Sequence, residues 1–267
     1  MQYHEIIYDK RDKVAVVTLN RPARLNAITP TLAAEFKEAM LDAERDTGIA
    51  AIIVTGAGKS FCPGMDMAAL QSAAGQTGQA EQPAPSSTNI DHHSLFGFIL
   101  NMRKPVVGAI NGNCVGMGFS MALHFDIRIA GEGTRLSAIF VRRGLSIEYG
   151  SSWLLPRLVG MSHAMDLALT GRIISAPEAL SMGLVSRVVP DGQLLETAIG
   201  MAREISVYCS PTAVAEAKRM LWQHLTADYQ IATDDSTAIM SSMSRHSDFK
   251  EGVMSFVEKR LPRFLPV

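Results

Sequence analysis

The chain has 267 residues and is 47% hydrophobic, so it is long enough and apolar enough to bury a sizeable core. Its 25 basic and 26 acidic residues give a formal net charge of -1, which excludes the strongly basic proteins that coat nucleic acid or anionic membranes. Three widely spaced cysteines, no secretory leader and no apolar run of the roughly 20 residues that a membrane helix needs predict a soluble, cytoplasmic protein with reduced thiols and no metal site.

Short apolar strands alternate with helices in the first part of the chain. Four segments rich in β-branched and apolar side chains are expected to form buried strands: residues 13–20, 50–55, 105–110 and 125–130. Thr29 and Pro30 predict the start of an amphipathic helix, and a second helical stretch with glycines covers residues 116–124. This alternation predicts an α/β fold with a mostly parallel sheet covered on both faces.

Helical patterns dominate the second part of the chain. The predicted helices are residues 161–170, 177–182, 194–206, 212–224 and one near 253–259. Pro211 is well placed to begin one of these helices and Gly183 to end another. We therefore expect an α/β core over residues 1–200 and a helical C-terminal region over residues 201–267. Residues 71–89 are rich in Gln, Gly, Ala, Pro and Ser and are expected to form a mobile loop.

Two segments share a design that suits the binding of negative charge. Residues 56–66 (GAGKSFCPGMD) and 111–126 (NGNCVGMGFSMALHFD) each follow a predicted strand, turn at glycines and begin a helix. Glycine lets the backbone turn tightly, and a helix start presents N–H groups without partners. Two such N–H groups aimed at one point would form an oxyanion hole. The same glycines could instead serve only tight turns and close helix packing.

Four ordered motifs resemble those of the enoyl-CoA hydratase/isomerase, or crotonase, superfamily. They are NRPARLNAI at 20–28, SFCPGMD at 60–66, KPVVGAINGNCVGMG at 104–118 and FVEKRLPRF at 256–264. The resemblance implies a crotonase-like spiral core of ββα units, a C-terminal helical trimerisation region, and a homotrimer or a dimer of trimers. It also implies an acyl-CoA substrate from fatty acid metabolism, with no cofactor beyond the CoA moiety of that substrate.

The resemblance further implies which residues bind the substrate. The thioester carbonyl is expected between the backbone N–H groups of Met65 and Met117, where two preorganised donors would stabilise the negative charge that develops on its oxygen. The CoA moiety is expected along five residues of the first two motifs: Arg24, Leu25, Ala27, Asp66 and Met67. Phe256 and Lys259 from the last helix of a neighbouring subunit are expected to complete the CoA site. Arg24 and Lys259 could equally be solvated surface charges.

The acidic residues of the site bear on which reaction it catalyses. Hydratases of this superfamily use two glutamates, but this chain has Ser120 and Phe140 at the corresponding positions. Glu148 remains, in GLSIEYG, at the place that carries the acid of several isomerases of the superfamily. One carboxylate is enough to move a double bond, because it removes a proton at one carbon and returns it at another. Glu148 could instead cap the following helix or face solvent.

Three functions remain open at this point. The first is isomerisation of a carbon–carbon double bond in an enoyl-CoA, with Glu148 as the proton shuttle. The second is hydration, or another reaction of the superfamily such as thioester hydrolysis or carbon–carbon cleavage, with Glu148 acting on water. The third is acyl-CoA binding without catalysis, which the replacement of both hydratase glutamates favours.

Overall fold

The computed structural model describes residues 3–75 and 95–266. The strands of this part are β1 (Ile6–Arg11), β2 (Val14–Leu19), β3 (Ala51–Gly56), β4 (Ser60–Cys62), β5 (Val106–Ile110), β6 (Asn113–Val115), β7 (Ile127–Gly131), β8 (Arg135–Ser137), β9 (Ile174–Ser175) and β10 (Arg187–Val189). The α-helices are α1 (Pro30–Arg45), α2 (Met67–Gly75), α3 (Met117–Leu123), α4 (Ser151–Thr170), α5 (Ala176–Ser181), α6 (Leu194–Tyr208), α7 (Pro211–Gln223), α8 (Tyr229–Met243) and α9 (Ser247–Val257).

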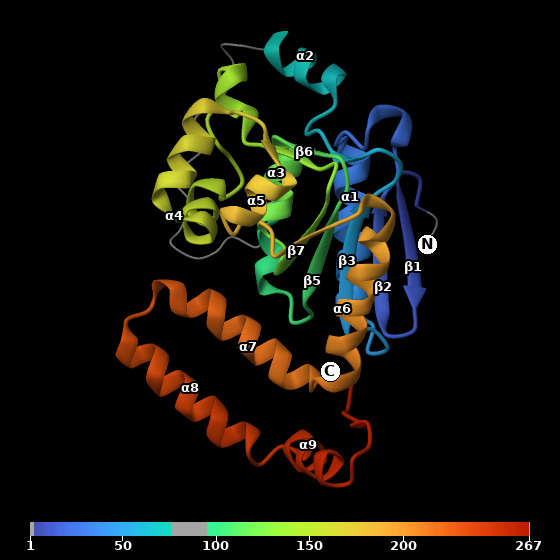
Figure 1. Ribbon diagram of the computed structural model, residues 1–267, viewed down its shortest axis with the longest axis vertical. Helices are drawn as coiled ribbons and strands as arrows, with labels where there is room; N and C mark the ends of the chain where they lie inside the picture. The colour runs from blue at the N-terminus through green and yellow to red at the C-terminus, as the bar shows by residue number, and fades with distance from the viewer. Residues whose placement is uncertain (1–2, 76–94, 267) are drawn as a thin grey trace.

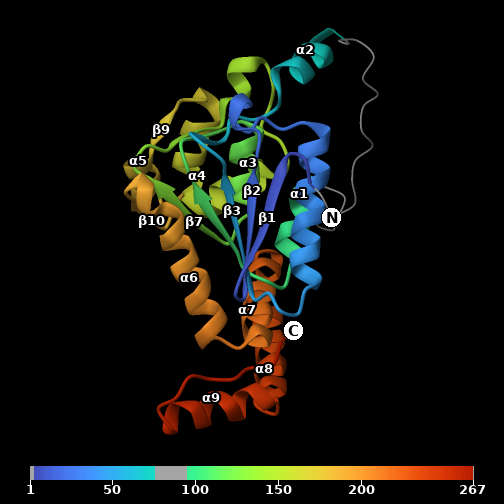
Figure 2. The same ribbon diagram turned by 90° about the vertical axis from the view of Figure 1, so that its right-hand side faces the viewer.

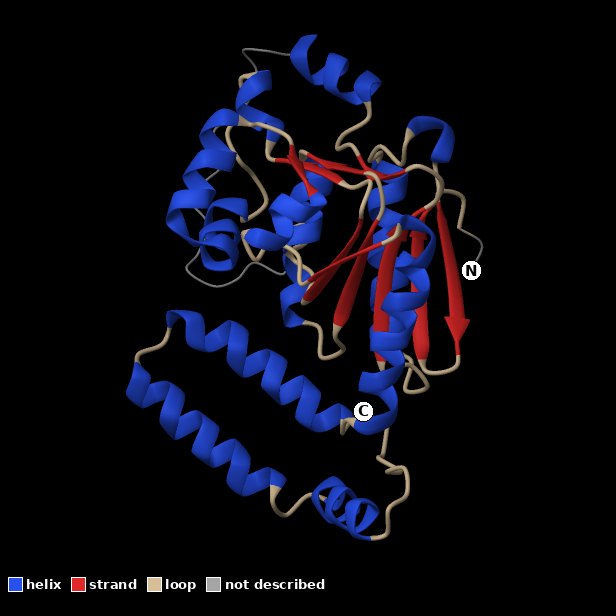
Figure 3. Ribbon diagram, in the orientation of Figure 1, coloured by secondary structure: helices blue, strands red, loops and turns tan. Residues whose placement is uncertain are grey.

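These strands form two sheets, which Figure 3 shows in red. The larger sheet has the strand order β1-β2-β3-β5-β7-β10, and all its neighbouring strands are parallel except β1 and β2. The smaller sheet has the order β4-β6-β8-β9 and is parallel except for its last pair. The chain passes from the larger to the smaller sheet after β3 and again after β5, so β4 and β6 become neighbours (Figure 1).

The larger sheet is covered on both faces, as the sequence predicts. Successive side chains of a strand point to opposite faces, so β2 contributes to two separate cores. Val14 and Val16 belong to the core that includes Ala198 of α6, whereas Val17 belongs to the core that includes Phe36 of α1. Figure 2 shows α6 and α1 on opposite sides of the sheet. The predicted α/β fold with a mostly parallel sheet is therefore confirmed.

Most of the predicted elements are present, with some corrections. The four predicted strands correspond to β2, β3, β5 and β7, and α1 begins as expected, with the Thr29 hydroxyl accepting a hydrogen bond from the Leu32 N–H at 3.0 Å. The helix predicted at 161–170 is present as the second part of α4, which follows a kink at the non-helical Gly160, and the first part from Ser151 was not predicted. The helix near 253–259 is α9. Within the segment 71–89, the loop prediction is wrong for residues 71–75, which belong to α2, and the rest lies outside the described residues. Helix α8 was not predicted, because none of its residues is buried.

Helices α7, α8 and α9 extend away from the two sheets (Figures 1 and 2). A buried ion pair attaches α7 to the core, with Lys218 Nζ 2.7 Å from Asp126 Oδ2. The Asp126 carboxylate also accepts hydrogen bonds from the Val106 N–H at 2.7 Å and from Trp222 Nε1 at 3.3 Å. The start of β5, the segment before β7 and α7 are therefore joined at one carboxylate.

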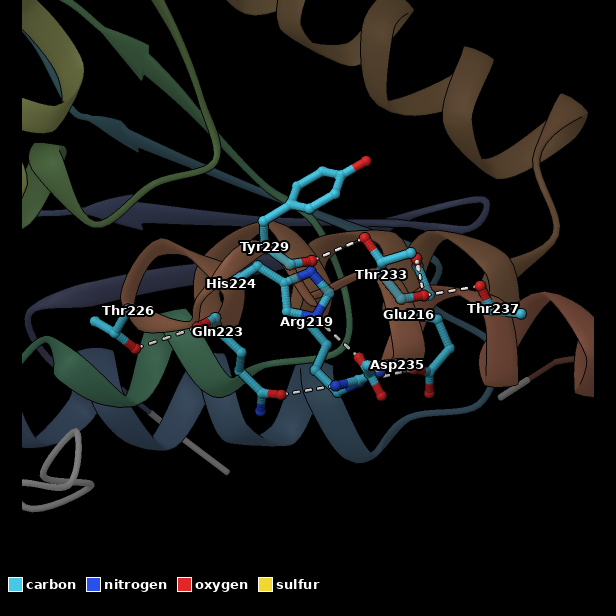
Figure 4. A network of polar contacts seen from close by, with 10 residues as sticks. Glu216, Arg219, Gln223, His224, Thr226, Tyr229, Thr233, Asp235 and Thr237 are labelled. Atoms are coloured by element: carbon cyan, nitrogen blue, oxygen red, sulfur yellow. Dashed lines mark hydrogen bonds and ion pairs between the residues drawn. The ribbon is translucent and has the colours of Figure 1, made fainter. Parts of the chain in front are cut away.

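A polar network holds α7 against α8. Asp235 of α8 lies 2.9 Å from the guanidinium of Arg219 and 2.9 Å from Nε2 of His224, and Arg219 also pairs with Glu216 at 2.7 Å. Figure 4 shows these side chains meeting between the two helices. No helix in the described ranges combines the length and the apolar composition that a membrane crossing requires.

We expect Lys218→Met to lower the free energy of unfolding by about 3 kcal/mol, because loss of the buried lysine leaves the partly buried Asp126 carboxylate without its counter-charge. Urea denaturation followed by circular dichroism measures this change. The exposed Lys250 of α9 offers a matched control, since Lys250→Met removes a lysine without removing a buried ion pair. Equal unfolding midpoints for the two variants would contradict the expected role of the ion pair.

Candidate functional site

The first predicted donor, the N–H of Met65, follows β4 at a glycine turn. The Ile28 N–H donates to the Gly64 carbonyl at 2.8 Å, and the Asp66 N–H donates to the Ile28 carbonyl at 3.0 Å. In this parallel pairing Ile28 forms backbone hydrogen bonds with the residues before and after Met65, so the N–H of Met65 points away from Ile28. Within the described residues it has no hydrogen-bond acceptor.

The second predicted donor, the N–H of Met117, opens α3. The first N–H groups of a helix have no acceptor within the helix, and the described residues supply none for Met117. Gly116, the residue before it, has a φ of 55° and lets the chain turn from β6 into the helix. Both predicted donors are therefore unpaired N–H groups that follow neighbouring strands of the smaller sheet.

Two glycines allow these segments to approach each other closely. A Cβ atom on Gly64 would lie 3.3 Å from the Met117 nitrogen, and a Cβ atom on Gly118 would lie 2.3 Å from the Cys62 carbonyl oxygen. The second distance is too short for any residue but glycine without a shift of the backbone. The structure thus brings the turn at Gly64, directly before Met65, close to the start of α3 at Met117.

Two buried thiols support the turns that carry these N–H groups. Cys62 and Cys114 occupy the same register in β4 and β6. The Gly64 N–H donates to Cys62 Sγ at 3.4 Å, and Cys114 Sγ donates to the Gly118 carbonyl at 3.4 Å. Burial raises the pKa of Cys62 to about 12, against the opposing effect of the Gly64 N–H, and burial also raises the pKa of Cys114 well above its usual value.

We expect neither Cys62 nor Cys114 to react with a disulfide reagent such as Ellman's reagent while the protein is folded. The thiolate is the reactive form, and both burial and the raised pKa values disfavour it. Mass spectrometry of the labelled protein checks this, with urea-unfolded protein as the control in which all cysteines react. Labelling of Cys62 in the folded protein, at a rate comparable to that of a free thiol, would contradict the burial of this turn.

Glu148 lies in the segment between a 3-10 helix (Ile139–Arg143) and α4. Its side chain is half-buried and has no hydrogen-bond partner among the described residues, and burial raises its pKa. Its sequence neighbours Ile147, Tyr149 and Trp153 pack against the hydrophobic core. Gly150 occupies the N-cap of α4 and no side chain caps this helix, which excludes the alternative that Glu148 is its cap.

The two positions at which hydratases carry glutamates are fully enclosed. Ser120 is buried in α3, and its hydroxyl lies 2.8 Å from the hydroxyl of Ser151. Phe140 is buried in the hydrophobic core. His124 binds the Ser120 carbonyl through Nδ1 at 2.8 Å, and burial lowers its pKa to about 4, so it is uncharged at neutral pH. None of these residues supplies a carboxylate.

The residues predicted to follow the CoA moiety lie on two segments that the structure joins. Arg24, Leu25 and Met67 are exposed and Ala27 is buried. Asp66 is half-buried, and its pKa is lowered first by the hydrogen bond from the Ala68 N–H and then by Arg21. In the described part of the chain, no group of three histidine, cysteine, aspartate or glutamate side chains could hold a metal ion.

Two residues that hold these segments together were missed in the sequence. Arg21 donates to the Ala27 carbonyl at 2.6 Å and lies 3.1 Å from Asp66 Oδ2. The buried Asn26 donates to the carbonyls of Ala57 at 2.9 Å and Ser60 at 2.6 Å, and accepts a hydrogen bond from the Arg21 N–H. Both residues lie inside the NRPARLNAI motif. Asn26 stands between Leu25 and Ala27, and a polar residue between apolar ones was the available signal for it.

Phe256 and Lys259 are not brought to the CoA segments of their own chain. Phe256 is 85% exposed near the end of α9, and Lys259 follows that helix. Figure 1 places α9 at the opposite end of the molecule from α2, which begins at Met67. Any part that these residues play in binding CoA therefore requires a second subunit, as the resemblance implies.

The fold and this arrangement define an enzyme of the crotonase fold, and comparison with known proteins places the chain in a family. The family model described as enoyl-CoA hydratase/isomerase matches residues 9–265, so the chain belongs to the enoyl-CoA hydratase/isomerase family. A crystal structure of a probable enoyl-CoA hydratase/isomerase from Mycobacterium abscessus has a TM-score of 0.87 and 33% identity, with coverage of 98% of this chain and 99% of that chain.

Curated relatives carry the names of both reaction types. The chain is 35% identical over 254 residues to the enoyl-CoA hydratase ACTT3 of Alternaria alternata, covering 95% of this chain and 83% of the relative. It is 34% identical over 255 residues to the 1,2-epoxyphenylacetyl-CoA isomerase of Escherichia coli, covering 94% of each. The family and its acyl-CoA chemistry are thus shown, whereas the names do not distinguish an isomerase from a hydratase.

Proposed function

We propose that the protein isomerises a carbon–carbon double bond of an enoyl-CoA, with Glu148 as the proton shuttle and the N–H groups of Met65 and Met117 as the oxyanion hole. The observation that carries this proposal is the half-buried Glu148 carboxylate, which has no hydrogen-bond partner among the described residues, together with the absence of carboxylates at Ser120 and Phe140. Hydration is most easily catalysed with two carboxylates, whereas one is sufficient for a proton transfer between two carbons.

The reaction follows from the charges that develop on the substrate. Glu148 removes a proton from one carbon of the acyl chain, and the electron pair moves through the conjugated system to the thioester oxygen. The two backbone N–H groups stabilise the negative charge on that oxygen. Glu148 then returns the proton to a different carbon, which shifts the double bond. The raised pKa of Glu148 makes it a better base than an exposed glutamate, because burial disfavours its charged form.

Isotope exchange tests the reaction directly. An enoyl-CoA incubated with the enzyme in heavy water should exchange hydrogen for deuterium at the α or γ carbon, and the double bond should move. Water labelled with oxygen-18 should leave no label in the product. Uptake of oxygen-18 into the product, or recovery of the enoyl-CoA with its double bond at the original carbons, would contradict the isomerase proposal.

A hydratase or hydrolase that uses Glu148 to activate water is the second candidate. The names of several relatives favour it, including the Alternaria enzyme and a probable enoyl-CoA hydratase of Mycobacterium tuberculosis that is 34% identical to this chain over 266 residues. Oxygen-18 in a hydroxyacyl-CoA product would support hydration, and oxygen-18 in a free acid would support thioester hydrolysis. Tight CoA binding without turnover of any enoyl-CoA would support a binding protein instead.

We also propose that the working form is a homotrimer or a dimer of trimers in the cytoplasm, with no cofactor besides the CoA of the substrate. An apolar groove of about 820 Å³ lies among α7, α8 and α9, and residues such as Met220, Met240 and Phe249 line it. Unlike the core helices, α8 buries none of its residues within the monomer. An apolar groove on helices that project from a core is suited to contact another subunit.

A further inference from the structure

The hydroxyls of Ser120 and Ser151 join the two halves of the proposed site. Ser120 lies in α3, the helix that begins with the Met117 N–H, and Ser151 is the first residue of α4, directly after the Glu148 segment. The two oxygens are 2.8 Å apart, and both side chains are at most 1% exposed. Water cannot replace this hydrogen bond in such a place, so each hydroxyl depends on the other for its partner.

Each serine also makes a backbone hydrogen bond next to one of the two proposed functional groups, the Met117 N–H and the Glu148 carboxylate. The Ser120 N–H donates to the Gly116 carbonyl at 2.9 Å, which closes the first turn of α3 around Met117. The Ser151 N–H donates to the Glu148 carbonyl at 3.0 Å. A short and direct set of hydrogen bonds therefore runs from the helix start that carries one proposed donor to the residue that carries the proposed base.

The segment that this hydrogen bond anchors has an unusual backbone. Tyr149 has a φ of 51° and Gly150 a φ of 73°, so two consecutive residues adopt the left-handed region between Glu148 and α4. The left-handed region costs energy for residues other than glycine, and such a conformation persists only where surrounding contacts hold it. On one side of the turn the Tyr149 ring packs edge-on against the Phe96 ring, with the ring centroids 5.4 Å apart. On the other side the Ser151 hydroxyl forms its hydrogen bond with Ser120.

We propose that Ser120 and Ser151 are positioning residues, which together fix the carboxylate of Glu148 at its working distance from the Met117 N–H. This inference rests on the proposed function and deepens it. Ser120 occupies the position of a hydratase glutamate, so this chain uses that position to hold the remaining carboxylate in place. The serines touch neither the substrate nor the transferred proton, and they act only through Met117 and Glu148.

The test compares Ser120→Ala, Ser151→Ala and the double variant with the wild type. We expect each single variant to lower kcat by about 10- to 100-fold, because a small displacement of a reacting group has effects of this size. KM and the dissociation constant of a non-reacting acyl-CoA should change less than the rate. The double variant should be no slower than the slower single variant, since either substitution breaks the same hydrogen bond.

Ser206→Ala is a matched control, because Ser206 is a buried serine in α6 whose hydroxyl donates to the Arg203 carbonyl and has no part in the proposed site. It should keep the wild-type kcat. If Ser120→Ala does not fold, the Ser151→Ala variant alone decides. Single variants with wild-type kcat, or additive losses in the double variant, would overturn this inference while Glu148→Gln still abolishes deuterium exchange. Exchange that survives in Glu148→Gln would overturn the proposed function and this inference with it.

Discussion

Glu148→Gln should lower kcat by about 10²- to 10⁴-fold, the usual contribution of a general acid–base group. Glutamine keeps the shape of the side chain and cannot carry a proton between two carbons. The same variant should lose deuterium exchange from heavy water into the acyl chain. Binding of CoA should be unchanged, because the residues that we propose for CoA lie on other segments. Steady-state kinetics and mass spectrometry of the recovered thioester measure the two effects.

Two controls separate a catalytic role of Glu148 from a structural one. Glu132→Gln removes an exposed glutamate from the turn between β7 and β8 and should leave kcat unchanged. Burial raises the pKa of Glu148 in the folded protein, so its charge costs stability progressively as the pH rises from the unfolded pKa towards the higher folded value. Glu148→Gln should therefore be at least as stable as the wild type at pH 7 and lose this advantage in acid. A Glu148→Gln protein with wild-type kcat would exclude the shuttle.

The raised pKa of Glu148 also predicts how the rate depends on pH. The base must be ionised to accept a proton, so kcat/KM should fall as the pH drops through its pKa. The midpoint of this fall should lie at a higher pH than the ordinary pKa of glutamate, which is about 4.3. Burial is the cause of the raised pKa. Replacing an apolar residue that shields Glu148 from water by a smaller one should therefore move the fall in kcat/KM towards lower pH.

Gly118→Ala is expected to reduce kcat by about 10²- to 10³-fold, the effect of losing one donor from an oxyanion hole. The added Cβ atom would lie 2.3 Å from the Cys62 carbonyl oxygen, so α3 and the end of β4 must move apart. That movement separates the Met117 N–H from the Met65 N–H. Kinetics with an enoyl-CoA measure the loss, and circular dichroism shows whether the variant still folds.

Gly200→Ala is the matched control for this substitution. Gly200 also lies inside a helix, α6, but a Cβ atom there would meet no atom within 4 Å. Alanine favours helix more than glycine does, so this variant should be as active as the wild type and slightly more stable. A folded Gly118→Ala protein with wild-type kcat would show that the spacing of the two segments does not control the reaction.

The sequence predicted those parts of the fold that depend on local pattern. Runs of β-branched and apolar residues located β2, β3, β5 and β7, and Thr29 with Pro30 located the start of α1. The strands of the smaller sheet were not predicted as strands, because β4, β6 and β8 have three residues each and β9 has two. Such short segments carry no visible period, and only the contacts between them make them strands.

The residues of the candidate site also fall into two groups, those that local sequence indicates and those that only contacts distant along the chain reveal. The resemblance of the motifs to those of the family pointed to Met65, Met117 and Glu148 as candidate site residues, because the turns that carry them have a recognisable sequence. The sequence did not identify Arg21 or Ser151 as parts of the arrangement, since their partners are distant along the chain. Arg21 reaches Asp66, and Ser151 reaches Ser120, only after the fold has formed. Phe256 and Lys259 lie far from the CoA segments of their own chain, so the predicted role of these residues would require a second subunit.

The groups that we propose to hold the thioester oxygen belong to peptide bonds, and every amino acid except proline supplies the same N–H. Evolution can therefore exchange the side chain at Met65 or Met117 while the proposed charge-stabilising groups stay in place. Met117 is buried in the hydrophobic core, so replacements there must also fit the surrounding side chains. Folded variants with other side chains at these two positions should keep the reaction, whereas proline at either position should abolish it.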